Sequence, residues 1–358
     1  MEGLRGLAAL LVLFVHFHVL MKSFVRPGAW GPPTTLFLAS LGQTGVDLFF
    51  VLSGFLMYGV MLKPSFRYVP YLIRRLQRLY PVFLGVFACY LILSHFFPES
   101  SKLPQTGTVT YLLVNLFMLP GMYPVPPMIT VAWSLSYEWF FYLSAPLVVL
   151  GFGLRSCSRL QRCIFLLLLA GLHLGLCIGG YSGHPRLVMF IAGCLLLEGA
   201  NGGWWKGELV TKGEWLAIGA VLLNWAQIGW GGVVIDNSAL FAGNAGSASA
   251  ALFVTNFWFI GYALCFRGWL ARLLSLAPLR WLGNISYSYY LAHGMTLHGL
   301  QRLLVKVHVS SISTGAYAVL FLVSLIVTFA VAVLFYVTLE RPFLARKSLE
   351  SRQPATVG

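Results

Sequence analysis

This sequence contains few charged residues. Only 9% of its 358 residues are charged, 58% are hydrophobic, and the mean hydropathy is +0.80. This composition excludes an ordinary soluble domain and is typical of a helical protein that crosses a membrane several times. With 10 acidic residues the net charge is +14, but no stretch is long and basic enough to bind DNA or RNA. The sequence therefore predicts the lipid bilayer, and no nucleic acid, as a partner.

The signatures of soluble enzymes, metal sites and disulfide scaffolds are also missing. There is no Gly-rich nucleotide loop, no HExxH zinc motif and no GxSxG elbow. The six cysteines lie in or beside apolar segments without paired spacing, so we predict no metal and no disulfide framework. No basic n-region or small-residue cleavage site marks a cleavable signal peptide, so the first apolar segment is expected to be a membrane span.

Ten apolar runs are long enough to cross a bilayer, which predicts an all-α integral membrane protein with about ten transmembrane helices. The runs cover residues 5–22, 43–62, 79–97, 131–151, 161–180, 185–201, 214–232, 247–266, 281–302 and 314–338. The run at 111–119 is too short to span and favours a re-entrant or interfacial helix. We expect one transmembrane domain at 1–345 and a cytoplasmic tail at 346–358.

The distribution of lysine and arginine predicts the orientation. Eighteen of the 24 lie in the loops on one side, and six lie on the other: Lys22, Arg26, Lys102, Arg186, Arg302 and Lys306. Loops rich in lysine and arginine remain in the cytoplasm. We therefore expect both termini to be cytoplasmic and the chain to be a multi-pass protein of the cell (inner) membrane.

The first span carries two ionisable residues. Arg5 and His16 are eleven positions apart, which places them on one helix face roughly 16 Å apart along its axis. Ionisable groups inside a membrane normally face a bundle interior or a water-filled cavity, so this pair marks a functional site.

Asp47 and Glu138 also lie within apolar segments, and both segments enter from the outer side. We predict that the two acids and His16 converge in the outer half of a shared cavity. A histidine held by a carboxylate suits general-base catalysis on a hydroxyl group. The alternative is that each acid pairs with an arginine or a tryptophan and only holds helices together.

Two further sets of residues are candidates for binding. Arg74, Arg75 and Arg78 precede the third span and could grip phosphates through guanidinium forks, or meet anionic lipid head groups. Trp133, Ser134 and Ser136 make the surroundings of Glu138 polar. His293 lies among tyrosines near mid-membrane, either as a second site histidine or as a hydrogen-bonded core residue.

Six motifs occur in an order that resembles the membrane-bound acyltransferase 3 family, over nearly the whole chain. They are GLRGLAALLVLFVH, GVDLFFVLSGFL, RRLQRLYP, WSLSYEWFFYL, GNISYSYYLAH and ERPF. Glu2 stands where the family usually has aspartate before GLRG. The chain is expected to lack the C-terminal SGNH domain that many relatives carry.

The resemblance implies an O-acyltransferase that moves an acyl group, most simply acetyl, from cytoplasmic acyl-CoA to a hydroxyl of a glycan or glycosylated metabolite. Arg5 and His16 match the family's arginine–histidine pair, Arg75 and Arg78 its RxxR element, and Asp47 the acid of its second-helix motif. Its Ser-x-Glu element matches Ser136 and Glu138. His16 would act as general base or carry the acyl group, and Asp47 or Glu138 would orient it.

Two other functions fit a bundle with buried charges. A transporter or flippase of a lipid-linked sugar or other anionic substrate is one, although no repeat or pair of broken helices supports it. A non-catalytic scaffold that presents acceptors to another enzyme is the other, and it predicts that replacing His16 has no effect.

Overall fold

The computed structural model describes residues 1–26, 31–180, 184–206, 213–223, 245–309 and 311–343. These residues form helices, and the one β-type pairing among them is an isolated bridge between Val25 and Ile312. The all-α prediction is confirmed. Six helical stretches in this part of the chain are long and apolar enough to cross a membrane: Glu2–Phe24, Ala39–Met61, Tyr68–Phe96, Arg159–Ile178, Ala248–Cys265 and Thr314–Phe343.

The predicted count of ten spans is not confirmed. The spans expected at 131–151 and 281–302 correspond to α6 (Ala132–Gly151) and α13 (Ser286–Lys306), whose polar side chains lower their hydropathy. Helix α8 (Val188–Gly202) has 15 residues, about 22 Å of rise, so it is shorter than a spanning helix. The run at 214–232 lies partly outside the described residues, as does the whole predicted tail at 346–358.

The chain divides into two compact units. The first unit comprises Met1–Phe66, Leu143–Asn284 and His308–Phe321, and the second comprises Arg67–Tyr142, Ile285–Val307 and Leu322–Gly358. Helices α6 and α14 (Thr314–Phe335) contribute residues to both units.

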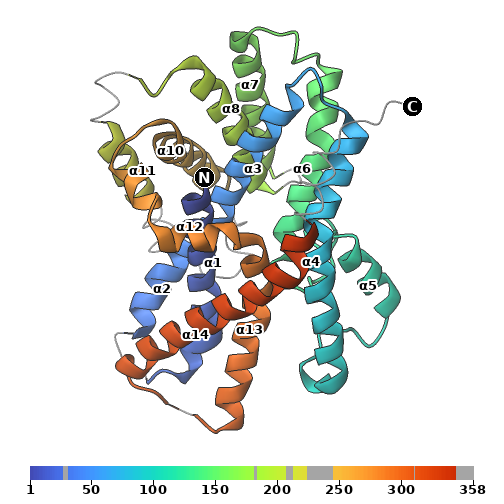
Figure 1. The fold of residues 1–358 in the computed structure, drawn as a ribbon, viewed down its shortest axis with the longest axis vertical. Helices are drawn as coiled ribbons and strands as arrows, with labels where there is room; N and C mark the ends of the chain where they lie inside the picture. Colours follow the sequence, from blue (N-terminus) through green and yellow to red (C-terminus); the bar gives the residue numbers. More distant parts are fainter. Residues whose placement is uncertain (27–30, 181–183, 207–212, 224–244, 310, 344–358) are drawn as a thin grey trace. The chain divides into compact units, whose positions relative to one another are not determined.

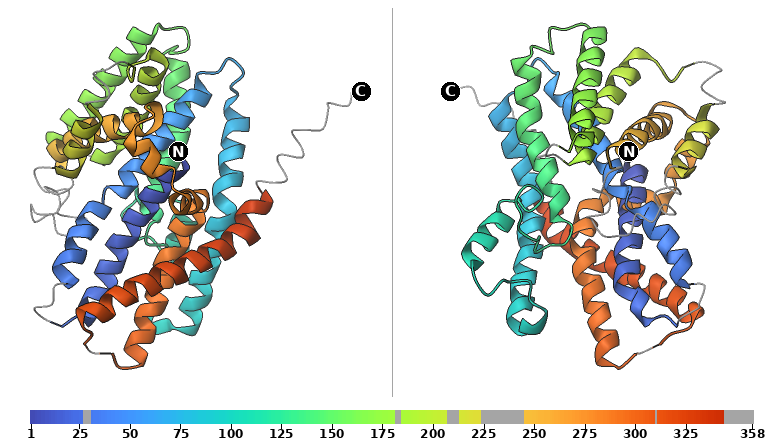
Figure 2. Two further views of the ribbon diagram at one scale, coloured as in Figure 1. Left: turned by 60° about the vertical axis from the view of Figure 1, so that its left-hand side comes forward. Right: turned by 180° about the vertical axis from the view of Figure 1, so that it is seen from behind.

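The first unit is built around α1 (Glu2–Met21). Helix α1 packs against α2 (Gly31–Gly42), α3 (Gly45–Met61) and α12 (Ala277–Asn284), as Figures 1 and 2 show. Helices α7 (Arg159–Ile178), α10 (Ala245–Cys265) and α11 (Trp269–Leu274) complete it. Glycine permits the close approach of α1 and α12, because a Cβ atom on Gly6 would lie 2.0 Å from the carbonyl oxygen of Leu279.

Helices α3 and α8 form the most extensive helix pair of this unit and run parallel. Asp47 lies beside Arg186 just before α8, Gly54 packs on Phe190 and Gly193, and Tyr58 bonds to Glu198. The contacts therefore follow the same order along both helices. The predicted topology requires this direction, because the spans expected at 43–62 and 185–201 both run from outside to inside.

We expect Gly54→Ala or Gly193→Ala to lower the free energy of unfolding by about 3 kcal/mol. A Cβ atom on Gly54 would lie 2.1 Å from the carbonyl oxygen of Phe190, so the two helices would have to separate. Thermal unfolding in detergent measures the loss. The control is Gly171→Ala in α7, where a Cβ atom meets nothing within 4 Å; it should be neutral or slightly stabilising. Equal melting temperatures for all variants would contradict this packing.

The second unit is built around α4 (Tyr68–Phe96), which packs against α13 and the π-helical turn Tyr336–Glu340. The predicted span at 79–97 missed the start of α4. The segment before it has too many charges for an apolar run, but leucine, arginine and glutamine favour helix, and Pro70 is tolerated in a first turn. The arginines at 74, 75 and 78 therefore lie within the helix.

One amide side chain joins distant parts of the long segment between α4 and α6. The segment contains the helical turn Pro98–Ser100 and α5 (Thr108–Leu116), which confirms that the apolar run at 111–119 forms only a short helix. Asn115, which is 1% exposed, donates to the carbonyl groups of Tyr111 and Pro126 and accepts from the backbone N–H of Met128 at 2.7 Å. These bonds hold the non-helical residues after α5 in one conformation.

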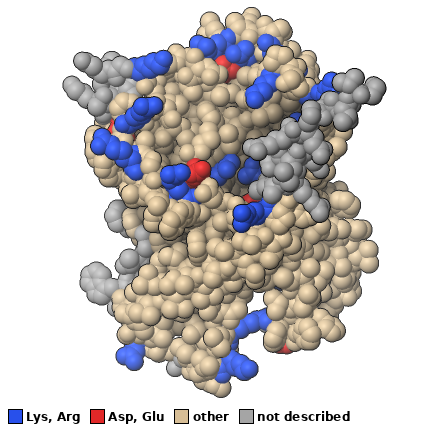
Figure 3. All heavy atoms as spheres, viewed as in Figure 1, with Lys and Arg blue, Asp and Glu red and all other residues tan. Residues whose placement is uncertain are grey.

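Most of the visible surface carries no charge, and the basic side chains gather in separate patches (Figure 3). Many large apolar side chains of α7 and α14 are exposed, for example Leu168 at 69% and Ile326 at 67%. Apolar exposure on this scale is expected where lipid covers the surface. The protein is a membrane protein.

Candidate active site

The predicted site residues are divided between the two units. Arg5, His16 and Asp47 belong to the first unit. The second unit holds the others: Arg74, Arg75, Arg78, Trp133, Ser136, Glu138 and His293.

Arg5 and His16 lie on the same uninterrupted helix, α1, and both side chains are partly buried. The His16 Nδ1 atom donates a hydrogen bond to the carbonyl oxygen of Val12 at 3.0 Å, because a carbonyl group can only accept. A proton on Nδ1 leaves the lone pair on Nε2, the form of imidazole that serves as a general base. The backbone of α1 thus fixes the tautomer, a role that the sequence analysis gave to a carboxylate.

Asp47 is paired with an arginine that the sequence analysis had counted only as a loop cation. Its side chain is 0% exposed, and its Oδ1 atom lies 3.7 Å from Nε of Arg186, which is 7% exposed. Arg186 also donates from Nη1 to the carbonyl oxygen of Gln43 at 2.9 Å. The pair ties α3 to the segment before α8, as the alternative interpretation of Asp47 expected. Neither Asp47 oxygen accepts a hydrogen bond from the described residues.

Arg75 is held between two tyrosine rings. The centre of its guanidinium group lies 5.8 Å from the ring of Tyr71 and 5.9 Å from that of Tyr142. Its Nε and Nη1 atoms are buried and donate no hydrogen bond to any described residue. Unpaired buried donors are costly, so a guanidinium in this state is suited to an anionic ligand. Arg74 adjoins Arg75 on α4, and both are partly exposed.

Glu138 lies in the same neighbourhood as this arginine cluster. The Tyr142 hydroxyl donates to Oε1 of Glu138. Glu138 and Arg78 both act electrostatically on Tyr142 and on Tyr287 of α13. In the sequence the acid and the arginines looked like separate sites, and the second unit brings them together.

The start of α6 is bonded to α13. Ser134 Oγ lies 2.7 Å from the hydroxyl of Tyr290, near the beginning of α13, and Tyr290 also donates to the carbonyl oxygen of Val131 at 3.4 Å. Helix α6 therefore begins beside the first turns of α13.

Ser136 and Trp133 have structural contacts on the loop side of α6. The Ser136 hydroxyl, 0% exposed, donates to the carbonyl oxygen of Ala132 and accepts from the N–H of Gly121 at 3.0 Å. Tyr137 donates to the carbonyl oxygen of Gly121, and its ring packs 6.1 Å from that of Trp133. These contacts fasten the preceding loop to α6.

His293 is 1% exposed and stacks on Tyr289, with ring centroids 6.2 Å apart. Its Nδ1 atom donates to the carbonyl oxygen of Tyr289 at 3.2 Å. Burial and this local bond agree with the interpretation of His293 as a hydrogen-bonded core residue.

Sequence reasoning missed a third acid inside an apolar segment, Glu198, although its position in CLLLEG was visible. It accepts hydrogen bonds from Arg162 at 2.6 and 3.0 Å and from the Tyr58 hydroxyl at 3.0 Å. The tyrosines around Arg75 were also missed, because ring contacts between distant segments leave no local signal. Within the described residues, no group of three or more His, Cys, Asp or Glu side chains is placed to hold a metal ion.

The chain is similar to known acyltransferases over most of its length. The profile of the acyltransferase 3 family, described as an acyltransferase domain, matches residues 1–337. The exopolysaccharide production protein ExoZ of Rhizobium meliloti is 29% identical over 331 residues, which cover 86% of this chain and 91% of that protein. No solved structure matches the chain at a significant level.

Of two other relatives, one is a longer protein and the other matches over a shorter range. The O-acetyltransferase OatA of Staphylococcus aureus is 24% identical over 328 residues, 82% of this chain and 49% of OatA. The acyltransferase MdmB of Streptomyces mycarofaciens is 31% identical over 152 residues, 41% of this chain and 38% of MdmB. Because the family profile covers nearly the whole chain, this protein belongs to the acyltransferase 3 family and is an O-acyltransferase.

Proposed function

We propose that this enzyme transfers an acyl group, in the simplest case acetyl, from cytoplasmic acyl-CoA to a hydroxyl group of a glycan or glycosylated metabolite, as a multi-pass protein of the inner membrane. The name of ExoZ supports a polysaccharide acceptor, and that of OatA supports acetyl as the transferred group.

The observation that carries the choice of donor is the state of Arg75. Its two buried nitrogen atoms find no acceptor among the described residues, while Arg74 and Arg78 add positive charge on the same helix. The phosphates of CoA supply acceptor oxygens for guanidinium groups. The predicted orientation places the start of α4, where these arginines lie, on the cytoplasmic side, from which acyl-CoA would enter.

His16 is proposed as the catalytic base. Its Nε2 atom takes the proton of the acceptor hydroxyl, and the hydroxyl oxygen attacks the thioester carbonyl carbon. The carbon–sulfur bond then breaks, and the leaving CoA thiolate takes the proton from the imidazolium. Proton transfer of this kind contributes roughly 100- to 10,000-fold to a rate. In the second form of the proposal, His16 first accepts the acyl group itself.

The remaining predicted residues have supporting roles in this proposal. Arg5 would polarise the thioester or guide the pantetheine arm. Asp47 would act through its pair with Arg186, and Glu138 through the tyrosines beside the arginine cluster. Trp133, Ser136 and His293 would shape the surroundings of the acceptor.

We expect Arg75→Gln to raise the KM for acetyl-CoA by about 10- to 100-fold, the effect of one lost hydrogen-bonding charge. The KM for acetyl-pantetheine, which lacks the nucleotide phosphates, should stay unchanged. Thiol release by the purified protein, measured with both donors, gives this comparison directly.

The matched control is Arg67→Gln, an exposed arginine that precedes α4 and lies outside the cluster. It removes the same charge and should leave both KM values unchanged. An equal rise for both donors in Arg75→Gln would contradict phosphate binding by Arg75. If the wild-type protein releases no thiol but moves a labelled glycolipid across liposomes, the transport hypothesis replaces acyl transfer.

A further inference from the structure

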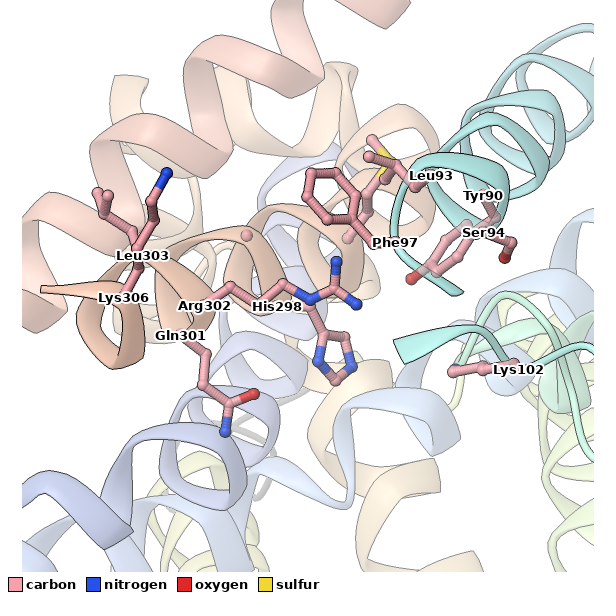
Figure 4. A pocket seen from close by; sticks show the side chains of 12 residues that line it. Tyr90, Leu93, Ser94, Phe97, Lys102, His298, Gln301, Arg302, Leu303 and Lys306 are labelled. Carbon is pink, nitrogen blue, oxygen red and sulfur yellow. The ribbon is translucent and has the colours of Figure 1, made fainter. Parts of the chain in front are cut away.

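The second unit contains a cavity of about 550 Å³ between the ends of α4 and α13. This volume lies within the range of small-molecule sites, roughly 300–1,000 Å³. Figure 4 shows His298 and Arg302 of α13 directed into the space that faces Tyr90 of α4 and Lys102 of the following segment. None of the predicted site residues lines this cavity.

The lining is cationic and capable of hydrogen bonding. Lys102, Arg302 and Lys306 contribute positive charge, and none of the 12 lining residues is acidic. Ser94 and Gln301 add uncharged polar groups, while Tyr90 and Phe97 supply aromatic faces. Cations, amide and hydroxyl groups beside aromatic rings form a lining suited to a sugar that carries a negative charge.

Two of the cations are held in place. The Lys102 ammonium donates to the carbonyl oxygen of Met128 at 3.1 Å and to the Thr130 hydroxyl at 2.9 Å. The Arg302 guanidinium lies 5.1 Å from the centre of the Phe97 ring. Neither cation is paired with a carboxylate in the part of the chain that the structure describes.

The position of these cations in the sequence favours a functional role. Lysine and arginine are scarce on the predicted outer side, where only six of 24 are found. Three of those six line this one cavity. Attraction to anionic lipid explains the many cations of the cytoplasmic side, but it gives no reason for half of the outer ones to converge.

We propose that this cavity binds the anionic group of an acidic saccharide, a carboxylate or a phosphate, and so selects charged acceptors. The inference rests on the proposed function, because it assigns the acceptor class. Arg302 would hold the anion through its guanidinium fork, with Lys306 and Lys102 adding charge, while Gln301 and Ser94 contact sugar hydroxyls.

Binding should also depend on pH through Lys102. The residue is exposed in part, but its ammonium contacts the Met128 and Thr130 oxygens, and partial burial lowers the pKa of Lys102 from 10.5 to about 8. It faces the Tyr90 ring of α4 and the Met128 and Thr130 oxygens, with His298, Arg302 and Lys306 of α13 across the cavity. Since a lysine loses its charge above its pKa, anion binding should weaken as the pH rises through about 8, and Lys102→Arg should remove that dependence.

The test measures equilibrium binding to the full-length protein in neutral nanodiscs without any acyl donor. The probes are trigalacturonate for carboxylate, glucose 1-phosphate for phosphate and maltotriose as the neutral sugar. Arg302→Gln and Lys306→Gln should each weaken binding of the two anions by about tenfold and leave maltotriose unaffected. The matched control, Arg26→Gln, removes an exposed outer-side cation of the first unit and should change nothing.

Three results would overturn the proposal. The first is equal affinity for charged and neutral sugars, and the second is anion binding that Arg302→Gln and Lys306→Gln leave unaffected. The third is displacement of the bound sugar when empty phosphatidylglycerol nanodiscs are added. The last would identify a lipid head-group site. Thiol release from acetyl-CoA by the same proteins keeps the two proposals apart. Turnover without selective anion binding refutes the proposed anion site and supports acyl transfer. Selective anion binding without turnover supports the anion site and refutes acyl transfer.

Discussion

Replacement of His16 by alanine is expected to lower the rate of acyl transfer by roughly 100- to 10,000-fold. The variant should bind acetyl-CoA as well as the wild-type protein does, because the proposed phosphate contacts come from α4. Thiol release and acylation of the acceptor, both measured with purified protein, report the loss. The Nδ1 bond to Val12 holds the His16 imidazole in the tautomer whose Nε2 carries the lone pair, and alanine has no group that could accept the proton in its place.

The matched control is His18→Gln, two positions farther along α1. His18 is 4% exposed and lies on another face of the helix, so the change keeps a polar side chain without touching the proposed base. Full activity in His16→Ala would contradict the catalytic role and support the scaffold hypothesis. Mass spectrometry after a rapid acid quench separates the two forms of the proposal, because only an acyl carrier would show the added acyl mass on His16.

Arg162→Met is expected to lower the free energy of unfolding by about 3–5 kcal/mol. It removes a partner that donates to both oxygens of Glu198, whose side chain is 0% exposed. The carboxylate would then remain buried with the Tyr58 hydroxyl and Arg159, whose Nε is 4.0 Å away on a side chain that is 48% exposed. Denaturation followed by near-UV circular dichroism in detergent measures this change.

The double variant Arg162→Met with Glu198→Met tests the explanation. Removing both charges eliminates the desolvated carboxylate, so most of the lost stability should return. The control pair is Glu2–Arg280, whose side chains are 46% and 55% exposed. Glu2→Gln should cost about 1 kcal/mol or less, because water screens exposed ion pairs. A double variant as unstable as Arg162→Met would show that shape, and not charge, holds α3, α7 and α8 together.

The sequence predicted those parts of the fold that depend on local pattern. Apolar runs located the six helices that are long enough to span, and the alternating direction of the predicted spans makes α3 and α8 parallel, as the structure has them. It did not predict where α4 begins. Hydropathy follows the lipid-exposed part of a helix, whereas Tyr68–Leu79 is helical because its residues favour helix regardless of the membrane.

The candidate residues were identified in the sequence, but the contacts that surround them were not. Arg186 follows Asp47 by more than a hundred residues, and Tyr142 follows Arg75 by more than sixty, so their pairing depends on tertiary packing. The cavity beside α13 was missed because its cations looked like ordinary residues at helix ends.

The amide of Asn115 restrains the segment after α5, although the backbone of this segment is irregular. By bonding to Pro126 and Met128, it immobilises the stretch whose Met128 and Thr130 oxygens hold the Lys102 ammonium. That cation is therefore set at a fixed place before any ligand arrives, and little ordering entropy is lost on binding. Cations held at fixed positions discriminate between ligands by the spacing of their anionic groups as well as by the number of these groups. In the proposed cavity, acidic sugars that differ only in the position of one carboxylate should therefore bind with different affinities.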